Sequence, residues 1–170
     1  GLSFLQTAPD AMVLDCGCGG GANIKTLLKL CPNGKVQGID YSAVSVEKAR
    51  KVNARALAAG RCTVQQASVA ELPFEAEQFD VVTAFETVYF WPELAQNFRE
   101  VYRVLKPGGT FFICNEANGE TAKDDKWTQI INGMTIYTDA DLKVYLEQAG
   151  FCKIQSHKNK KGWLCVTAQK

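Results

Sequence analysis

The sequence predicts an α/β fold with a doubly wound, mostly parallel sheet. Short apolar segments typical of strands alternate with segments whose apolar residues recur at helical spacing, which is the pattern of successive βαβ units. The chain has 170 residues, the size of a single domain spanning residues 1–170. Residues 151–169 depart from the alternation, because two strand-like runs follow each other without a helix, which predicts an antiparallel hairpin at one sheet edge.

The first half of the chain is expected to supply three strands and two helices. They are a strand at 11–16, a helix at 22–31, a strand at 35–40, a helix between Ser42 and Gly60, and a strand at 62–68. Ser42 can cap the second helix, because its hydroxyl can accept a hydrogen bond from a free backbone N–H. Gly60 can end that helix, because glycine tolerates the left-handed conformation that often closes helices.

The second half is expected to continue the alternation and then to break it. Its elements are a strand at 79–85, a helix through residues 94–105, a strand at 110–114, a helix from Thr138 to Gly150, and the two final strands. Thr138 and Asp141 have the spacing of a capping box. Residues 116–137 show no periodicity and are too long for a plain connection, so we expect a lid over a site there.

Composition narrows the classes of function. Apolar residues make up 46% and charged residues 22%, the balance of an ordinary globular protein rather than a disordered chain. No apolar run approaches the roughly 18 residues needed to span a bilayer, so we expect no membrane partner. The formal net charge of +1 gives no long-range field for polyanions, so nucleic acid is not the expected partner either.

Cysteine usage indicates a reducing compartment. The seven cysteines are an odd number without paired spacings, and most lie in apolar runs, so we expect buried free thiols and a cytoplasmic protein. The chain has no CxxC motif and one histidine, so no metal site is expected.

The strongest local signal is the glycine-rich turn after the first strand. Gly17, Gly19 and Gly21 lie where the first helix begins, a place where backbone N–H groups can approach a ligand. Asp40 ends the second strand, at the position where a carboxylate can bind both ribose hydroxyls of a nucleoside. A nicotinamide-dependent oxidoreductase would use the same features. Asp15 separates the two interpretations, since a carboxylate before the glycines repels a pyrophosphate and suits a sulfonium cofactor.

Four motifs together resemble one family. They are Asp15-x-Gly17-x-Gly19-x-Gly21, Gly38-Ile39-Asp40-Tyr41-Ser42, Leu72-Pro73-Phe74 before residues 79–82, and Leu105-Lys106-Pro107-Gly108-Gly109. In this order they resemble a class I S-adenosylmethionine-dependent methyltransferase, and more narrowly the small-molecule branch called methyltransferase type 11. The resemblance implies a Rossmann-like sheet of seven strands, S-adenosylmethionine as cofactor and S-adenosylhomocysteine as product.

The resemblance also implies roles for individual residues. Asp15 and the turn through Gly17, Cys18, Gly19 and Gly21 would hold the methionine moiety, and Asp40 the ribose. Tyr41 would flank the adenine, with Ser68 and Val69 at its edge; many relatives have Asp at the position of Ser68. Phe85 and Glu86 would lie beneath the cofactor and face the acceptor. Relatives usually have helical segments before the first strand, so we expect an N-terminal cap to be missing here.

The acceptor side is less defined. Glu86 is the candidate general base and Glu116 a second one, although a structural role for Glu86 is equally compatible with the sequence. Tyr89 and Trp91 can form an aromatic wall, Trp127 and Tyr137 a lid or a small core, and His157 is expected in a solvated turn. The Pro-Pro-Tyr type motif of many amino-group methyltransferases and a Pro-Cys nucleophile are both absent, and the net charge is near zero. By this elimination and by the resemblance, we expect a small-molecule acceptor. A non-catalytic cofactor-binding module and the oxidoreductase remain alternatives, and the oligomeric state stays open.

Overall fold

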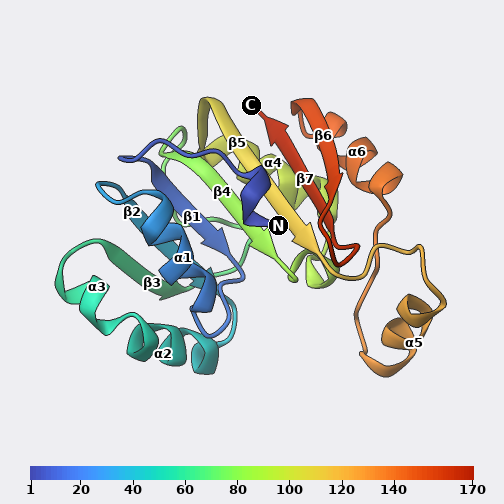
Figure 1. The fold of residues 1–170 in the computed structure, drawn as a ribbon, viewed down its shortest axis with the longest axis horizontal. Coiled ribbons are helices and arrows are strands. Elements are labelled where there is room, and N and C mark those ends of the chain that lie inside the picture. Colours follow the sequence, from blue (N-terminus) through green and yellow to red (C-terminus); the bar gives the residue numbers. More distant parts are fainter.

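The structure is a computed structural model that describes residues 1–170, apart from the side chains of residues 122, 123 and 125. Its centre is one seven-stranded sheet with the order β3-β2-β1-β4-β5-β7-β6 (Figure 1). The strands are β1 (Met12–Cys16), β2 (Lys35–Asp40), β3 (Cys62–Gln66), β4 (Phe79–Phe85), β5 (Leu105–Asn115), β6 (Cys152–Lys158) and β7 (Leu164–Gln169). Strands β1 to β5 are parallel, and β7 is antiparallel to β5 and β6. The predicted fold class is therefore confirmed.

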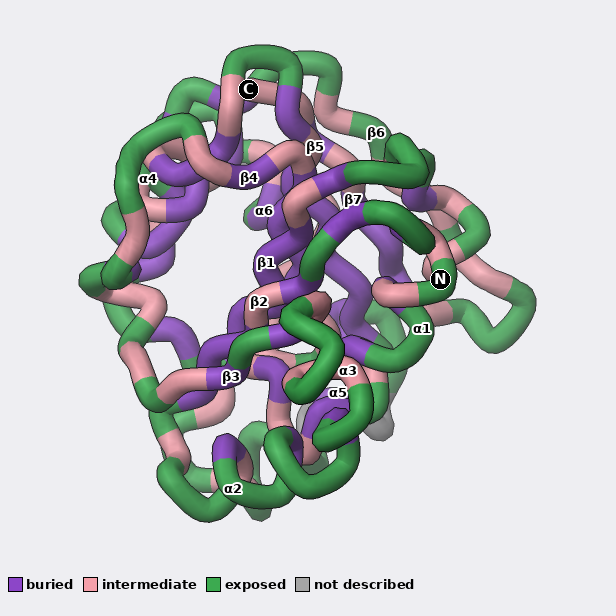
Figure 2. Tube along the Cα trace, turned by 90° about the vertical axis from the view of Figure 1, so that its left-hand side faces the viewer, coloured by how far each residue is buried: buried purple, intermediate pink, exposed green. Residues whose placement is uncertain are grey.

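Helices cover both faces of the sheet, and Figure 2 shows their exposed outer sides around buried strands. The helices are α1 (Ala22–Leu30), α2 (Ala43–Val52), α3 (Ala54–Ala58), α4 (Leu94–Val104), α5 (Ala122–Ile130) and α6 (Asp139–Gln148), with the 3₁₀ helices η1 (Leu2–Phe4) and η2 (Val88–Phe90). Buried apolar side chains of α1 and α2 belong to one core cluster, and those of α4 and α6 to the other. None of the helices described has the length and apolarity needed to cross a membrane.

The predicted helix caps are present. The Ser42 hydroxyl accepts a hydrogen bond from the N–H of Ser45 at the start of α2. Thr138 and Asp141 form the complete capping box of α6. Gly60 has a φ of +67°, the left-handed conformation expected where a helix ends. These short-range signals place α2 and α6 correctly because they depend on neighbouring residues alone.

The single helix expected between Ser42 and Gly60 is divided into α2 and α3 at Asn53. The buried Asn53 amide donates hydrogen bonds to the carbonyl oxygens of Gly21 at 3.0 Å and Ala49 at 2.9 Å. Asparagine favours such local side-chain bonds over helix continuation. The Asn53 side chain at this division therefore ties the second helical region to the glycine-rich turn.

Two strands have bounds other than those expected. β5 begins at Leu105, where we expected a helix to end, because Leu105 already pairs with Phe79 of β4 before the register shifts. β3 ends at Gln66, so Ser68, which was expected on the strand, lies in the loop after it with Val69.

The segment 116–137 contains α5, although its sequence shows no helical period. Residues 126–130 of this helix are all exposed, so it has no continuous apolar face to produce one. Tyr89 holds both ends of the segment: its hydroxyl accepts a hydrogen bond from Ala117 N–H, and its carbonyl accepts one from Thr135 N–H, each at 2.9 Å. The segment is therefore a loop with a helix, anchored to η2.

Six of the seven cysteines are buried and all seven are free, as expected for thiols that act as small apolar side chains; Cys152 is exposed. The expectation that His157 lies in a solvated turn is wrong. It lies on β6, and its ring stacks on Phe4 of η1 with centroids 4.6 Å apart. The stacking partner is about 150 residues away in sequence, so local charge patterning could not indicate it.

Candidate active site

The turn between β1 and α1 is held close to neighbouring segments. The N–H groups of Gly17 and Cys18 both donate to the carbonyl oxygen of Ile39 at 2.9 Å, which ties the turn to β2. Gly17 has a φ of +72°, and a Cβ there would lie 2.1 Å from the Thr87 hydroxyl oxygen. Because no larger residue fits without a shift, this part of the turn presents bare backbone.

Asp15 is a buried carboxylate at the end of β1 with one unsatisfied oxygen. The Thr83 hydroxyl donates to its Oδ1 at 2.8 Å, whereas Oδ2 has no hydrogen-bond partner in the described structure. Burial raises the pKa of Asp15 to about 7; the Thr83 hydrogen bond opposes the rise and the charge of Asp40 adds to it. A buried acceptor without a donor is destabilising, so this site favours a cationic or N–H-bearing ligand group.

Asp40 connects the glycine-rich turn to the start of α2. Its Oδ2 accepts a hydrogen bond from Gly19 N–H, and its Oδ1 accepts one from Ser42 N–H, both at 2.9 Å. Each carboxylate oxygen has a second lone pair. The carboxylate therefore organises the turn and retains acceptor capacity for a ligand hydroxyl.

A cavity of about 450 Å³, here called the cofactor cavity, opens beside this carboxylate. It brings together five residues that the sequence assigned to cofactor binding: Gly17, Asp40, Tyr41, Ser68 and Val69. Thr87, Phe90 and Trp91 also line it, and the indole N–H of Trp91 donates to the Thr87 hydroxyl at 3.3 Å. Trp91 is thus both a wall of this cavity and part of the core, where its ring stacks on that of Phe111.

The other residues predicted to bind the cofactor do not line this cavity. Asp15, Gly19 and Gly21 lie at or within the turn, and the Cys18 side chain is buried in the core. The ring of Phe85 packs against Phe112, with centroids 5.7 Å apart. Contact between these residues and a cofactor stays a prediction.

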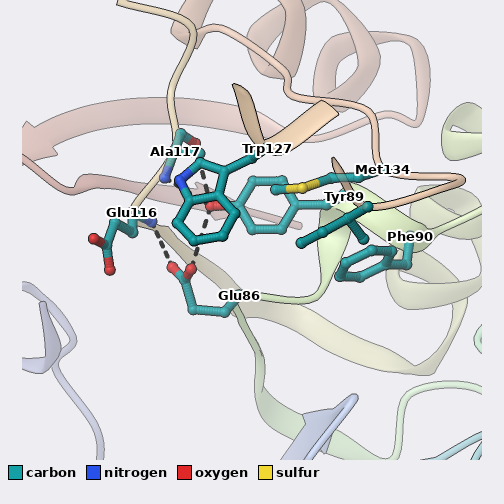
Figure 3. A pocket seen from close by; sticks show the side chains of 8 residues that line it. Glu86, Tyr89, Phe90, Glu116, Ala117, Trp127 and Met134 are labelled. Carbon is teal, nitrogen blue, oxygen red and sulfur yellow. Dashed lines mark hydrogen bonds between the residues drawn. The ribbon is translucent and has the colours of Figure 1, made fainter. Parts of the chain in front are cut away.

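A second cavity, of about 250 Å³, is here called the aromatic cavity (Figure 3). Its lining residues are Glu86, Tyr89, Phe90, Glu116, Ala117, Trp127, Ile131 and Met134. Phe90 lines both cavities, so the two adjoin. The segment 116–137 contributes to the walls of both, and its role as a lid stays a prediction.

Glu86 is the principal ionisable group of the aromatic cavity. Its φ of +57° is unusual for a residue with a side chain, and its N–H donates to the Cys114 carbonyl at 3.0 Å. One carboxylate oxygen accepts a hydrogen bond from Glu116 N–H, and the other lies 3.4 Å from the Tyr89 hydroxyl. Burial raises the pKa of Glu86, although the hydrogen bond from Glu116 N–H opposes the rise. Such a group is suited to accepting a proton.

Sequence reasoning assigned no role to several residues of these walls, among them Phe90, Ile131 and Met134. Ile131 and Met134 fall inside the segment expected to be a lid, which was the only signal for them. Tyr137, for which a lid or a small core was expected, packs edge-on against Tyr145 beside the main core. Trp127 is half exposed and lines the cavity.

Residues 14–113, more than half of the chain, match the family model described as a methyltransferase domain. The chain belongs to this family. The match covers the glycine-rich turn, Asp40 and Glu86, whereas the residues from Glu116 to Met134 that line the aromatic cavity lie beyond it. It also favours the methyltransferase interpretation over the nicotinamide-dependent oxidoreductase.

Curated relatives include methyltransferases of small molecules. The 24-methylenesterol C-methyltransferase 2 of Arabidopsis thaliana is 29% identical over 135 residues, which are 78% of this chain and 37% of the relative. The demethylmenaquinone methyltransferase of Symbiobacterium thermophilum is 35% identical over 111 residues, 65% of this chain and 44% of the relative. The chain therefore spans less than half the length of these relatives.

The fold is also that of solved methyltransferases. An S-adenosylmethionine-dependent methyltransferase from Aquifex aeolicus superposes with a TM-score of 0.80 at 21% identity, covering 98% of this chain and 85% of the other. Together with the family match, this likeness supports the class I methyltransferase fold that the four sequence motifs predicted.

Proposed function

We propose that this protein transfers a methyl group from S-adenosylmethionine to a small-molecule acceptor. The observation that carries the proposal is the pair of adjoining cavities. One is bordered by the glycine-rich turn and Asp40, and the other contains Glu86 among aromatic rings. The demethylmenaquinone and sterol methyltransferases among the relatives support an acceptor of this general class.

The residues around the cofactor cavity fit S-adenosylmethionine. The free Oδ2 of Asp15 suits its ammonium or sulfonium charge, and Gly17 borders the cavity with backbone atoms alone. Asp40 would accept from the ribose hydroxyls, and Tyr41, Ser68 and Val69 would surround the adenine. When bound, this cofactor supplies a methyl group on a positively charged sulfur, which is already a strong electrophile.

The chain's own contribution to catalysis is then mainly positioning. The aromatic cavity would hold the acceptor beside the cofactor, which converts an encounter of two molecules into a reaction within one complex. The segment 116–137 would exclude water from the acceptor. Glu86 would accept a proton where the acceptor atom carries one.

A non-catalytic cofactor-binding module is the second candidate. One observation favours it: both oxygens of Glu86 already have protein partners, as expected for a purely structural carboxylate. Turnover separates the two candidates. An assay with S-adenosylmethionine and a panel of phenols, amines, thiols, alkenes and quinols should yield S-adenosylhomocysteine with at least one acceptor if the protein is an enzyme.

Cofactor binding is tested first, by calorimetric titration of the intact protein with S-adenosylmethionine. We expect micromolar affinity, weakened about fivefold to tenfold by Tyr41→Ala because the ring can no longer cover the adenine. Val44→Ala is the matched control, since Tyr41 and Val44 are both 78% exposed but Val44 lies outside the cofactor cavity. No binding by the unmodified protein would refute the proposal.

The cytoplasmic location remains a further proposal. It rests on the seven free cysteines, which persist most readily in a reducing compartment.

A further inference from the structure

We infer that the aromatic cavity takes a small amine in its protonated, cationic form. This inference rests on the proposed methyl transfer and specifies the acceptor class of the same site. It is carried by three properties of the cavity: the sign of its charges, the arrangement of its rings around Glu86, and its volume.

The charge of the cavity wall is negative. Its ionisable residues are Glu86, Glu116 and Tyr89, and the described lining contains no lysine, arginine or histidine. The buried carboxylate of Asp124 also lies near enough to Tyr89 to raise the pKa of its hydroxyl further. An anionic acceptor would be repelled by these groups, whereas a cation would be attracted.

The Glu86 carboxylate lies beside aromatic side chains of the cavity wall. Figure 3 shows the Glu86 carboxylate turned toward the Trp127 ring and the Tyr89 hydroxyl, while the Glu116 carboxylate points away from the rings. Phe90 and the thioether of Met134 complete this wall. Ring faces attract cations through their quadrupole, and a carboxylate in the same cavity adds a charge-assisted hydrogen bond.

Glu86 retains a site for a ligand donor. The Tyr89 hydroxyl has one proton and two acceptors within reach, the Ala117 carbonyl at 3.2 Å and Glu86 Oε2 at 3.4 Å. The shorter contact is to the carbonyl, so the bond to Glu86 is weak. An ammonium N–H is a stronger donor than a phenol shared in this way, and it would satisfy Oε2 directly.

The volume restricts the size of the group that enters. About 250 Å³ lies below the roughly 300–1,000 Å³ of pockets that enclose drug-sized ligands. The cavity therefore suits a compact amine rather than a whole polycyclic or long-chain hydrocarbon. A wholly apolar acceptor would also bury the Glu86 charge without offering it a donor.

The proposed reaction balances in atoms and charge with the groups present in the cavity. The ammonium of the acceptor transfers one proton to the Glu86 carboxylate, which leaves a neutral amine and a protonated Glu86. The nitrogen lone pair then forms the N–CH₃ bond as the methyl–sulfur bond breaks, and its electron pair stays on sulfur as a neutral thioether. The methylated amine carries the positive charge, still facing the aromatic rings, and Glu86 returns its proton to water.

Three probes of nearly equal shape test the charge preference. Protonated 3-methylbutan-1-amine, 3-methylbutan-1-ol and 3-methylbutanoate carry a positive, a zero and a negative charge, and each is titrated by NMR into the intact protein with and without saturating S-adenosylhomocysteine. We expect the ammonium probe to bind at least tenfold more tightly than the alcohol, and the carboxylate to bind most weakly. Equal affinity for the ammonium probe and the alcohol, or preference for the carboxylate, would overturn the inference.

Two variants assign the preference to the cavity. Glu86→Gln should reduce the affinity for the ammonium probe about tenfold and change that for the alcohol less than twofold. Glu147→Gln is the matched control, because it removes the charge of an exposed glutamate on α6 that lines neither cavity, and it should change the affinity for the ammonium probe less than twofold. If Glu86→Gln does not fold, Trp127→Leu replaces it, since that half-exposed ring is not needed for the core; a fivefold loss for the ammonium probe alone is expected.

The outcome is distinguishable from failure of the proposed function. A protein that binds no S-adenosylhomocysteine but selects the ammonium probe would refute methyl transfer and keep the cation site. A protein that binds S-adenosylhomocysteine without selecting the ammonium probe would keep the proposed function and refute the amine as acceptor.

Discussion

Asp15 shows how one buried residue couples charge, stability and ligand binding. Its position before the glycines is visible in the sequence, but its burial and its bond to Thr83 arise only when β1 and β4 pair. The resulting pKa of about 7 means that the ionised form is disfavoured in the folded chain and restored in the unfolded one. A cationic cofactor group beside Oδ2 would reverse this preference.

The sign of the pH dependence follows from that pKa. Between the usual carboxyl pKa of 3.8 and about 7, the folded state binds more protons at Asp15 than the unfolded state. Its contribution to the free energy of unfolding therefore falls as pH rises through this interval, by up to about 1.4 kcal/mol per pH unit, and is constant above it.

Asp15→Asn should remove this slope. We expect the unfolding free energy of the variant to exceed that of the unmodified protein increasingly from pH 5 to pH 7, by about 2–3 kcal/mol in total. Urea unfolding at pH 5, 6, 7 and 8 without cofactor measures it, with Asp10→Asn as the control for loss of an exposed carboxylate. Parallel pH profiles for the unmodified protein and Asp15→Asn would contradict the assignment.

At the scale of elements, the sequence predicted the order of strands and helices but not how loops meet. Alternating periodicity and the caps at Ser42 and Thr138 are local signals, and the elements that depend on them are where we expected them. The division at Asn53 and the early start of β5 are decided by tertiary contacts, a bond to Gly21 and pairing with Phe79. Sequence periodicity contains no information about either contact.

The candidate site likewise has one part that the sequence could predict and one part that it could not. Gly17, Asp40 and Tyr41 could be predicted, because a parallel sheet places the ends of successive strands at one edge. The aromatic cavity could not, because Met134 and Trp127 reach it through a segment whose exposed helix leaves no periodic pattern. The position of this segment over the aromatic cavity depends on its hydrogen bonds to Tyr89 of η2.

Tyr89→Phe tests that dependence. The variant keeps the ring and the bond from Thr135 N–H to the carbonyl, but it loses the hydroxyl that accepts from Ala117 N–H. We expect amide hydrogen exchange at residues 116–118 to accelerate about fivefold to tenfold, because the free energy of local opening falls by roughly 1 kcal/mol. Exchange at residues 133–136 should change little. Tyr145→Phe is the control, since the Tyr145 ring packs against Tyr137 and lines neither cavity. Unchanged exchange at 116–118 would show that the hydroxyl does not hold the segment.

At the scale of the whole molecule, the cofactor cavity joins parts of the chain that are far apart in sequence. Its walls come from the turn after β1, the ends of β2 and β3, η2 and the segment 116–137, so a ligand there contacts both halves of the sheet. A ligand that binds only the folded state stabilises it by an amount set by its concentration relative to Kd. Ligand binding is therefore expected to stabilise the whole fold rather than one loop.

S-adenosylhomocysteine at a hundred times its Kd should raise the unfolding free energy by about 2.7 kcal/mol. For a chain of this length that corresponds to a rise in Tm of about 5–10 °C. Tyr41→Ala and Val44→Ala should leave the Tm without ligand nearly unchanged, because both side chains are largely exposed. At one fixed ligand concentration, Tyr41→Ala should lose about 1 kcal/mol of the stabilisation and Val44→Ala none. A Tm that does not respond to the ligand would show that the adjoining cavities do not form a cofactor site, and equal shifts in the two variants would place the adenine elsewhere.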